Sequence, residues 1–174
     1  MKLAEVKTGE VFKVGDIEFI KFSGDEEETV AVAKECLFDS EFGKNNDFRN
    51  SKILKKLKDE ILPKLEIAVG EEKILEHETE LTSLDGLKTY SSVASKISIP
   101  TFDFYRNNVS IFDEHKCDRW WWLATPNTTP EHYNDRWCLC VSPSGYIDFN
   151  FYCNFIGVRP FLIFVSSISV SCEE

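Results

Sequence analysis

The stretch of sequence that decides the fold lies between residues 120 and 164. It reads WWWLATP at 120–126, WCLCV at 137–141, SPSG at 142–145, YIDFNFYCNFI at 146–156 and GVRPFLIF at 157–164. Short apolar runs separated by Pro, Gly, Asn and Ser are typical of antiparallel strands joined by turns. We therefore expect strands at 137–141, 146–151 and 161–165, a hairpin turn at 142–145, a loop at 124–136 and a tight turn at 157–160.

Three adjacent tryptophans begin this stretch. On a strand, Trp120 and Trp122 point to one face and Trp121 points to the other. An aromatic platform for a sugar ring is one interpretation. Burial in the core is the favoured one, because adjacent buried indoles remove a large apolar area from water.

The returning strand separates two kinds of side chain by its alternation. The apolar face, which we expect to form the core, carries Ile147, Phe149, Phe151 and Cys153. The other face mixes rigid aromatic groups with small hydrogen-bonding groups, as adaptable binding surfaces do. It carries Tyr146, Asp148, Asn150 and Tyr152. An ordinary solvent-exposed strand face is the alternative interpretation.

The totals favour one folded domain over residues 1–174. The chain has 43% hydrophobic residues and a net charge of -10. The hydrophobic content supports a core, and the negative charge argues against nucleic acid and against anionic membrane surfaces as partners. The first seven residues lack the apolar core of a signal peptide, and no apolar run is long enough to span a membrane. We expect a soluble protein made in the cytoplasm, with membrane insertion excluded and possible association with a virion.

The six cysteines predict reduced thiols and no disulfide framework. Cys36, Cys117, Cys153 and Cys172 are isolated in the sequence and are expected to pack as small hydrophobic side chains. Cys138 and Cys140 would share one face of a strand. Because no other ligands follow a standard spacing, we expect no metal and no cofactor.

The first part of the chain predicts a scaffold. Residues 1–35 predict an antiparallel meander with strands at 10–14, 17–22 and 29–33. A loop at 39–50 is followed by a helix that Asn50 or Ser51 caps and that Pro63 ends or bends. Further on, we expect a strand with one wet face at 76–81, a short helix at 89–94, a strand at 97–99, and a helix at 102–107 capped by Thr101.

Three motifs carry a family resemblance: WWLATP at 121–126, VSPSG at 141–145 and GVRPF at 157–161. With KTGEVF at 7–12 and the LDGL turn at 84–87, they resemble a domain of unknown function that is widespread in low-GC Gram-positive bacteria and their prophages. The carboxy-terminal part is similar to the C-type lectin fold. That fold is shared with the formylglycine-generating enzyme and with the variable proteins of diversity-generating retroelements.

The resemblance to variable proteins implies a set of diversified, ligand-contacting positions near the carboxy terminus, within a ligand-binding subregion at 117–170. These positions are Asn127, His132, Tyr133, Asn134, Asp135, Trp137, Tyr146, Asp148, Asn150, Tyr152 and Asn154. The scaffold would contain Trp120, Trp122, Gly145, Gly157, Arg159 and Pro160. The calcium-binding signatures of sugar-binding lectins are absent from the sequence, so the resemblance does not imply calcium.

The sequence thus predicts an α+β, C-type lectin-like domain with small antiparallel sheets and two or three helices. Its predicted function is recognition of a protein or cell-surface ligand by a phage or prophage protein, without catalysis. One alternative is a formylglycine-generating-enzyme-like enzyme that uses Cys138 or Cys140 as its reactive centre. The other is a structural phage component with an invariant surface. The sequence does not predict an oligomeric state.

Overall fold

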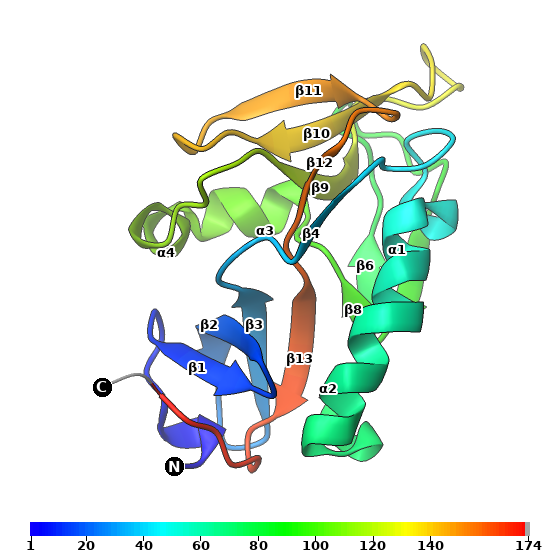
Figure 1. Ribbon diagram of the computed structural model, residues 1–174. Coiled ribbons are helices and arrows are strands. Elements are labelled where there is room, and N and C mark those ends of the chain that lie inside the picture. Colours follow the sequence, from blue (N-terminus) through cyan, green and yellow to red (C-terminus); the bar gives the residue numbers. More distant parts are fainter. Residues whose placement is uncertain (173–174) are drawn as a thin grey trace.

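The computed structural model describes residues 1–172 and shows an α+β architecture, as predicted (Figure 1). Helices and strands follow the order expected for most of the chain. The strands are β1 (Val11–Val14), β2 (Ile17–Gly24), β3 (Glu28–Ala33), β4 (Phe38–Ser40), β5 (Ile74–Leu75), β6 (His77–Glu80), β7 (Ser92–Ser95), β8 (Ile97–Ser98), β9 (Trp121–Pro126), β10 (Trp137–Val141), β11 (Ile147–Phe151), β12 (Ile156–Val158) and β13 (Phe161–Val165).

The helical segments are few and mostly short. They are α1 (Lys52–Lys56), η3 (Leu57–Ile61), α2 (Leu62–Val69), α3 (Phe102–Asn107) and α4 (Val109–Glu114), with single turns at η1 (Leu3–Glu5), η2 (Phe48–Asn50) and η4 (Glu71–Lys73). None of the helices in residues 1–172 combines the length and the apolar character needed to cross a membrane.

The predicted amino-terminal meander is confirmed. Strands β1, β2 and β3 are antiparallel neighbours, and the sheet continues through β13 to β5, with β8 also paired to β13. Phe12, Phe19 and Phe164 pack against one another on one face, with ring centroids 5.3–6.1 Å apart. Because Phe164 comes from the carboxy-terminal motif, the two ends of the chain share one core.

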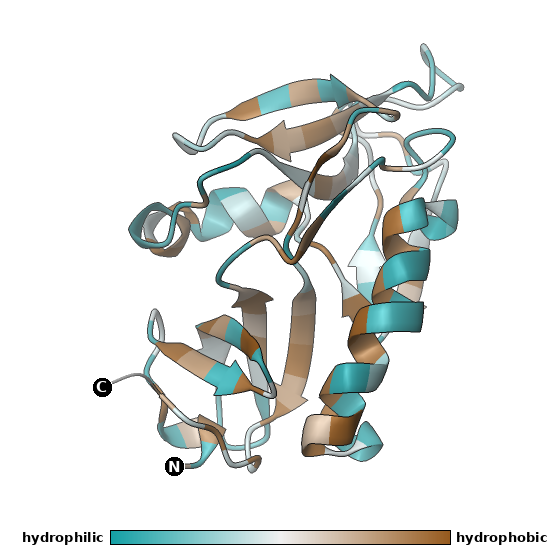
Figure 2. Ribbon diagram, in the orientation of Figure 1, coloured by the Kyte–Doolittle hydropathy of each residue, from teal (hydrophilic) through white to brown (hydrophobic). Residues whose placement is uncertain are grey.

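The decisive stretch supplies most of a second sheet, whose order is β11-β10-β9-β12-β4. The hairpin of β10 and β11 forms as predicted, with Trp137 opposite Phe151 and Val141 opposite Ile147. In Figure 2, β10 is mainly hydrophobic and β11 alternates between hydrophobic and hydrophilic residues. β11 is the edge strand, so one side of its backbone has no neighbouring strand in the sheet.

The expected tight turn at 157–160 is wrong in its first half. Gly157 and Val158 belong to β12, which runs parallel to β9 and antiparallel to β4. The chain then passes through Arg159 and Pro160 directly into β13 of the other sheet. A continuous extended segment therefore links the two sheets, because each half finds backbone partners in a different one.

The helix that begins after Ser51 continues to Val69. The Ser51 hydroxyl accepts a hydrogen bond from the Leu54 amide, as a predicted N-cap should. Pro63 does not end the helix. The turn before it widens instead into a π-helical segment, in which the Leu62 amide donates to the Leu57 carbonyl. This widening accommodates a proline ring that ordinary helical packing would exclude.

Two other expectations about the first part of the chain are corrected. The segment at 89–94 is not a helix, because residues 92–95 form β7 and pair with β6. The positive φ of Ser91, 55°, breaks any helix at that point. The expected loop at 39–50 contains the end of β4 and the η2 turn. The wet face of the predicted strand is confirmed, since Glu76, Glu78 and Glu80 are exposed.

Candidate ligand-binding surface

The foundation of the candidate surface is β9, in which all six residues are buried. Trp121 and Trp122 point to opposite faces, as the alternation predicts, and each enters a different apolar cluster. The Trp122 indole N–H donates to the Ser40 carbonyl at 2.9 Å. Trp120 is half-buried and meets Tyr146 edge-to-face at 5.6 Å. Core packing is thus the role of the Trp121 and Trp122 rings.

The hairpin above β9 has a core that differs from the predicted one. On the face expected to be core, Ile147 packs partly into the apolar cluster, but Phe149 is 48% exposed and Cys153 is exposed. On the other face, Cys138 and Cys140 of β10 are buried beside β9. Both faces of the sheet are therefore buried as far as β10 and reached by solvent at β11, because the core ends one strand before the edge of the sheet.

Polar side chains of β11 bind its own backbone. A carboxylate oxygen of Asp148 accepts a hydrogen bond from the Phe149 amide at 2.7 Å. The Asn150 side-chain oxygen accepts one from the Phe151 amide at 2.9 Å, and it also accepts one from the Asn154 side-chain amide. These contacts occupy edge amides that could otherwise pair with another strand. Asp148, Asn150 and Asn154, all predicted ligand contacts, thus lie together along this edge.

The loop after β9 brings together three other predicted contacts. Asn127, His132 and Tyr133 line a shallow cavity of about 260 Å³, with Leu84, Asp85 and Thr128 on its other side. His132 Nδ1 lies 2.7 Å from the Asp85 carboxylate, which also accepts hydrogen bonds from Thr128 at 2.6 Å and from Ser83 at 2.5 Å. The hydrogen bonds from Ser83 and Thr128, followed by that from His132, lower the pKa of Asp85 to about 2.

A buried asparagine holds this loop against the rest of the protein. The Asn46 side-chain amide donates to the carbonyls of Thr128 at 2.8 Å and Trp137 at 3.1 Å, and its oxygen accepts from the Tyr90 hydroxyl at 2.7 Å. Its own backbone amide donates to the Asp135 carbonyl at 2.8 Å. Since Asn46 is fully buried, its polar groups hold the loop backbone from the core side. The outward-facing side chains of the loop take no part in these hydrogen bonds.

Sequence reasoning missed Asn46, Tyr90 and the carboxylate role of Asp85. Asn46 and Tyr90 carry no local signal, because each acts through partners that are distant along the chain. Asp85 lies in the LDGL turn, which the sequence marks as a motif without showing what its carboxylate contacts.

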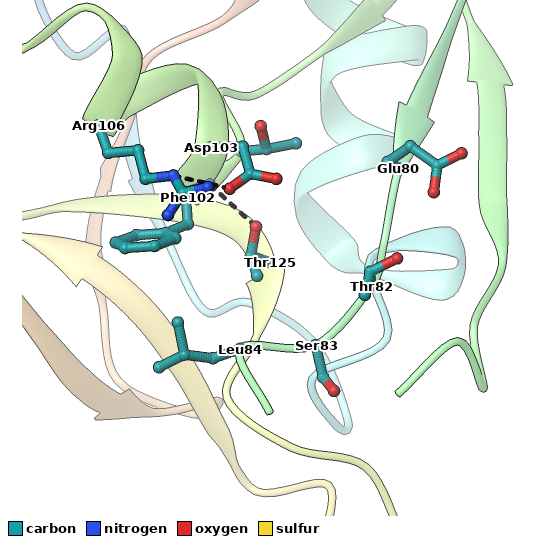
Figure 3. Close-up of a pocket in the computed structure, with 9 residues that line it drawn as sticks. Glu80, Thr82, Ser83, Leu84, Phe102, Asp103, Arg106 and Thr125 are labelled. Atoms are coloured by element: carbon teal, nitrogen blue, oxygen red, sulfur yellow. Dashed lines mark hydrogen bonds and ion pairs between the residues drawn. The ribbon is translucent and has the colours of Figure 1, made fainter. Parts of the chain in front are cut away.

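A larger cavity of about 590 Å³ adjoins the first and shares Leu84 with it (Figure 3). Phe102 and the ion pair between Asp103 and Arg106, 3.0 Å apart, line its α3 side. The Thr125 hydroxyl accepts a hydrogen bond from the Phe102 amide at 2.9 Å and thereby joins α3 to β9. No sequence pattern pointed to this cavity, because its walls come from three separate parts of the chain.

Exposed aromatic side chains are concentrated on the candidate surface. Within residues 1–172, the aromatic side chains that are largely exposed all lie between 133 and 155: Tyr133 (75% exposed), Trp137 (37%), Tyr146 (55%), Phe149 (48%) and Phe155 (69%). Singly exposed apolar residues are ordinary, and the grouping of five exposed aromatic rings in one segment makes this segment the candidate for an interaction site. Sequence reasoning placed Phe149 in the core and did not single out Phe155.

The remaining predicted contacts are more constrained. Tyr152 is half-buried, packs against Phe151 with ring centroids 5.0 Å apart, and accepts backbone hydrogen bonds from Phe42 and Gly43. The Asn134 side chain accepts a hydrogen bond from the Arg136 amide at 3.0 Å. Asp135 is half-buried. Six of the predicted positions therefore form two groups: Asn127, His132 and Tyr133 around the Asp85 cavity, and Asp148, Asn150 and Asn154 along the edge of the hairpin.

Cys138 and Cys140 share a face, as predicted for a strand, and both are buried. Burial raises the pKa of Cys138 well above its ordinary value and raises that of Cys140 to about 12. Both thiols are protonated at neutral pH, which disfavours a nucleophilic role for either.

Searches among protein-family models, curated proteins and solved structures found no match to this chain.

Proposed function

We propose that this protein is a binding protein that presents the surface of residues 127–155 to a protein ligand and performs no chemistry. The observation that carries this proposal is the concentration of Tyr133, Trp137, Tyr146, Phe149 and Phe155 on one exposed hairpin and its loop. Aromatic groups of this kind supply contact area at low conformational cost, and intervening Asn and Asp residues supply hydrogen bonds.

The frame beneath the surface supports the proposal. β9 is buried along its whole length, and Asn46 ties the loop to the body from below. The Tyr105 hydroxyl donates to the Gly145 carbonyl and thereby anchors the hairpin turn to α3. A surface held in this way loses little freedom on binding, so more of the contact energy is available for affinity.

The finer identity rests on the resemblance of the sequence motifs. We propose a C-type lectin-like domain of phage or prophage origin whose exposed positions are diversified, as in retroelement variable proteins. The division between positions supports this, since Asn127, Asn134, Asn150 and Asn154 lie outside the buried core while Gly157 and Arg159 lie within it. Deep sequencing of the encoding locus across a cell population tests it. Substitutions gathered at the four asparagines are expected, and an invariant locus would contradict diversification while leaving binding intact.

Site-specific photo-cross-linking tests binding itself. A variant of the protein that carries a photoreactive amino acid at position 133 or 149 is incubated with intact cells of the bacterial host and irradiated. The same group at Ile67, which is 87% exposed on α2, is the matched control. We expect one defined protein adduct from positions 133 and 149 and none from position 67. Identical adduct patterns at all three positions would contradict the proposal.

A further inference from the structure

The arginine of the GVRP motif is a buried cation. Arg159 is 1% exposed, and its guanidinium donates to the carbonyls of Ala33 and Lys34 at 3.0 Å and of His115 at 3.4 Å. It also lies over the Trp121 ring at 4.8 Å. Among residues 1–172, no carboxylate forms an ion pair with it. Because an unpaired buried charge is costly, its surroundings are a natural place for a counter-ion.

Two cysteines that are distant in the sequence meet beside this arginine. Cys36 follows β3 and Cys117 precedes β9, and both side chains pack in the apolar cluster that contains Trp121, near enough for each thiol to shift the pKa of the other. Cys117 also donates to the Lys34 carbonyl at 3.5 Å, the same carbonyl that Arg159 contacts. Cys117 is buried, whereas Cys36 is partly exposed and gives solvent access to the pair. The expectation that both pack as isolated hydrophobic side chains is therefore incomplete.

The glycine of the same motif makes room for the pair. A Cβ atom at Gly157 would lie 2.4 Å from the Cys36 sulfur and 2.9 Å from the Trp120 carbonyl. Both distances are shorter than non-bonded atoms can adopt, so any larger residue would displace the Cys36 side chain. Gly157 thus leaves the space that the Cys36 side chain occupies.

The Cys36–Cys117 pair and the buried Cys138–Cys140 pair differ in their electrostatics. The neighbouring Cys36 thiol has the largest effect in lowering the pKa of Cys117, and the positive charge of Arg159 lowers it further against the cost of burial. The Cys117 thiol, with burial, raises the pKa of Cys36. Cys138 and Cys140 lack such a partner, and burial raises the pKa of each. Of these four thiols, Cys117 is therefore the one that gives up its proton most readily.

We propose that Cys36 and Cys117 form an oxidisable dithiol that hydrogen peroxide converts into a disulfide. The Cys117 thiolate attacks one peroxide oxygen, the O–O bond breaks, and the leaving hydroxide takes up a proton to become water. The Cys36 sulfur then attacks the resulting sulfenic acid, and a second water leaves with the hydroxyl group and the Cys36 proton. The two sulfurs give up two electrons in total, and the new bond joins the β3–β4 connection to the segment before β9.

The test is oxidation of the folded protein with one equivalent of hydrogen peroxide at neutral pH. Remaining thiols are then alkylated with N-ethylmaleimide, and the digested protein is analysed by mass spectrometry. We expect a cross-linked peptide that joins Cys36 to Cys117 and is lighter by two hydrogen atoms than the two reduced peptides together. Cys138 and Cys140 should remain free thiols, which N-ethylmaleimide alkylates once the protein is unfolded. Cys36→Ser and Cys117→Ser should each abolish the cross-link.

Glu35→Gln tests the electrostatic basis separately. Glu35 is exposed, and its negative charge raises the pKa of Cys117, so its removal should speed disulfide formation by a factor of about two. Glu72→Gln, at an exposed position on η4, is the control and should leave the rate unchanged. The proposal is overturned if Cys36 and Cys117 both stay alkylatable while the exposed Cys153 is oxidised, or if both Gln variants react at the wild-type rate.

Discussion

Trp122→Phe tests whether β9 is the foundation on which the proposed surface depends. The substitution removes the indole N–H that donates to the Ser40 carbonyl and leaves a gap beside Phe42, whose ring centroid lies 5.5 Å from that of Trp122. Loss of the buried hydrogen bond costs about 1 kcal/mol. Loss of part of a fully buried ring costs about 2 kcal/mol. We therefore expect a decrease of about 3 kcal/mol in the free energy of unfolding.

Trp120→Phe is the matched control in the same strand region. Its ring is half-buried and meets only the exposed Tyr146 among the aromatic pairs of the described residues, so a loss of about 1 kcal/mol or less is expected. Urea unfolding followed by circular dichroism measures both variants. In thermal unfolding the Trp122 variant should lose about 6–12 °C for a chain of this size. Equal losses for the two variants would refute the reasoning that assigns Trp122 to the core and Trp120 to its border.

Three further predictions concern the supports of the surface. Tyr105→Phe removes the hydroxyl that binds the Gly145 carbonyl and should cost about 1–2 kcal/mol, measured by urea unfolding; an unchanged midpoint would contradict the anchoring role. Asp85 has a folded pKa of about 2, below its ordinary value of about 3.9. The ionised carboxylate therefore stabilises the fold above about pH 4, and this contribution is lost as the pH falls toward 2. The difference in melting temperature between wild type and Asp85→Asn should shrink over that range, and a constant difference would contradict the stabilising role of Asp85. Burial lowers the pKa of His77, which lies 2.8 Å from the Ser98 hydroxyl. Because the unfolded chain binds the proton more readily, the free energy of unfolding should fall as the pH drops below about 6.5. His77→Gln should flatten this decline, and an unchanged slope of stability against pH would argue against the role of His77.

The sequence predicted those features of the fold that depend on local patterns. Alternation and turn residues located the meander, the hairpin of β10 and β11, and the opposite directions of Trp121 and Trp122. Thr101 was predicted as a cap, and Ser51 was one of the two residues predicted to cap the longer helix, because capping depends on residues a few positions away. The segment at 89–94 was assigned wrongly because pairing with β6 determines its conformation, and that partner is not visible in a short window.

The assignment of ligand contacts to residues 127–154 stays a prediction, whereas some structural details of this region differ from the expected ones. Alternation placed Phe149 in the core without showing that β11 is an edge strand. The side chains of Asp148 and Asn150 were expected to face a ligand, and each is also bound to the next residue's amide. Asn46 and the Cys36–Cys117 pair depend on contacts between distant parts of the chain, which a single sequence does not reveal.

The most direct test of the binding proposal is the affinity of matched variants for the protein recovered by cross-linking at positions 133 and 149. Calorimetry compares wild type with Tyr133→Ala, Phe149→Ala and the control Ile67→Ala, whose side chain is also exposed but lies on α2. We predict that at least one aromatic substitution weakens binding about tenfold or more, equivalent to about 1.4 kcal/mol, and that the control leaves it unchanged. Unchanged affinity in both aromatic variants would contradict the assignment of the hairpin and its loop as the binding surface.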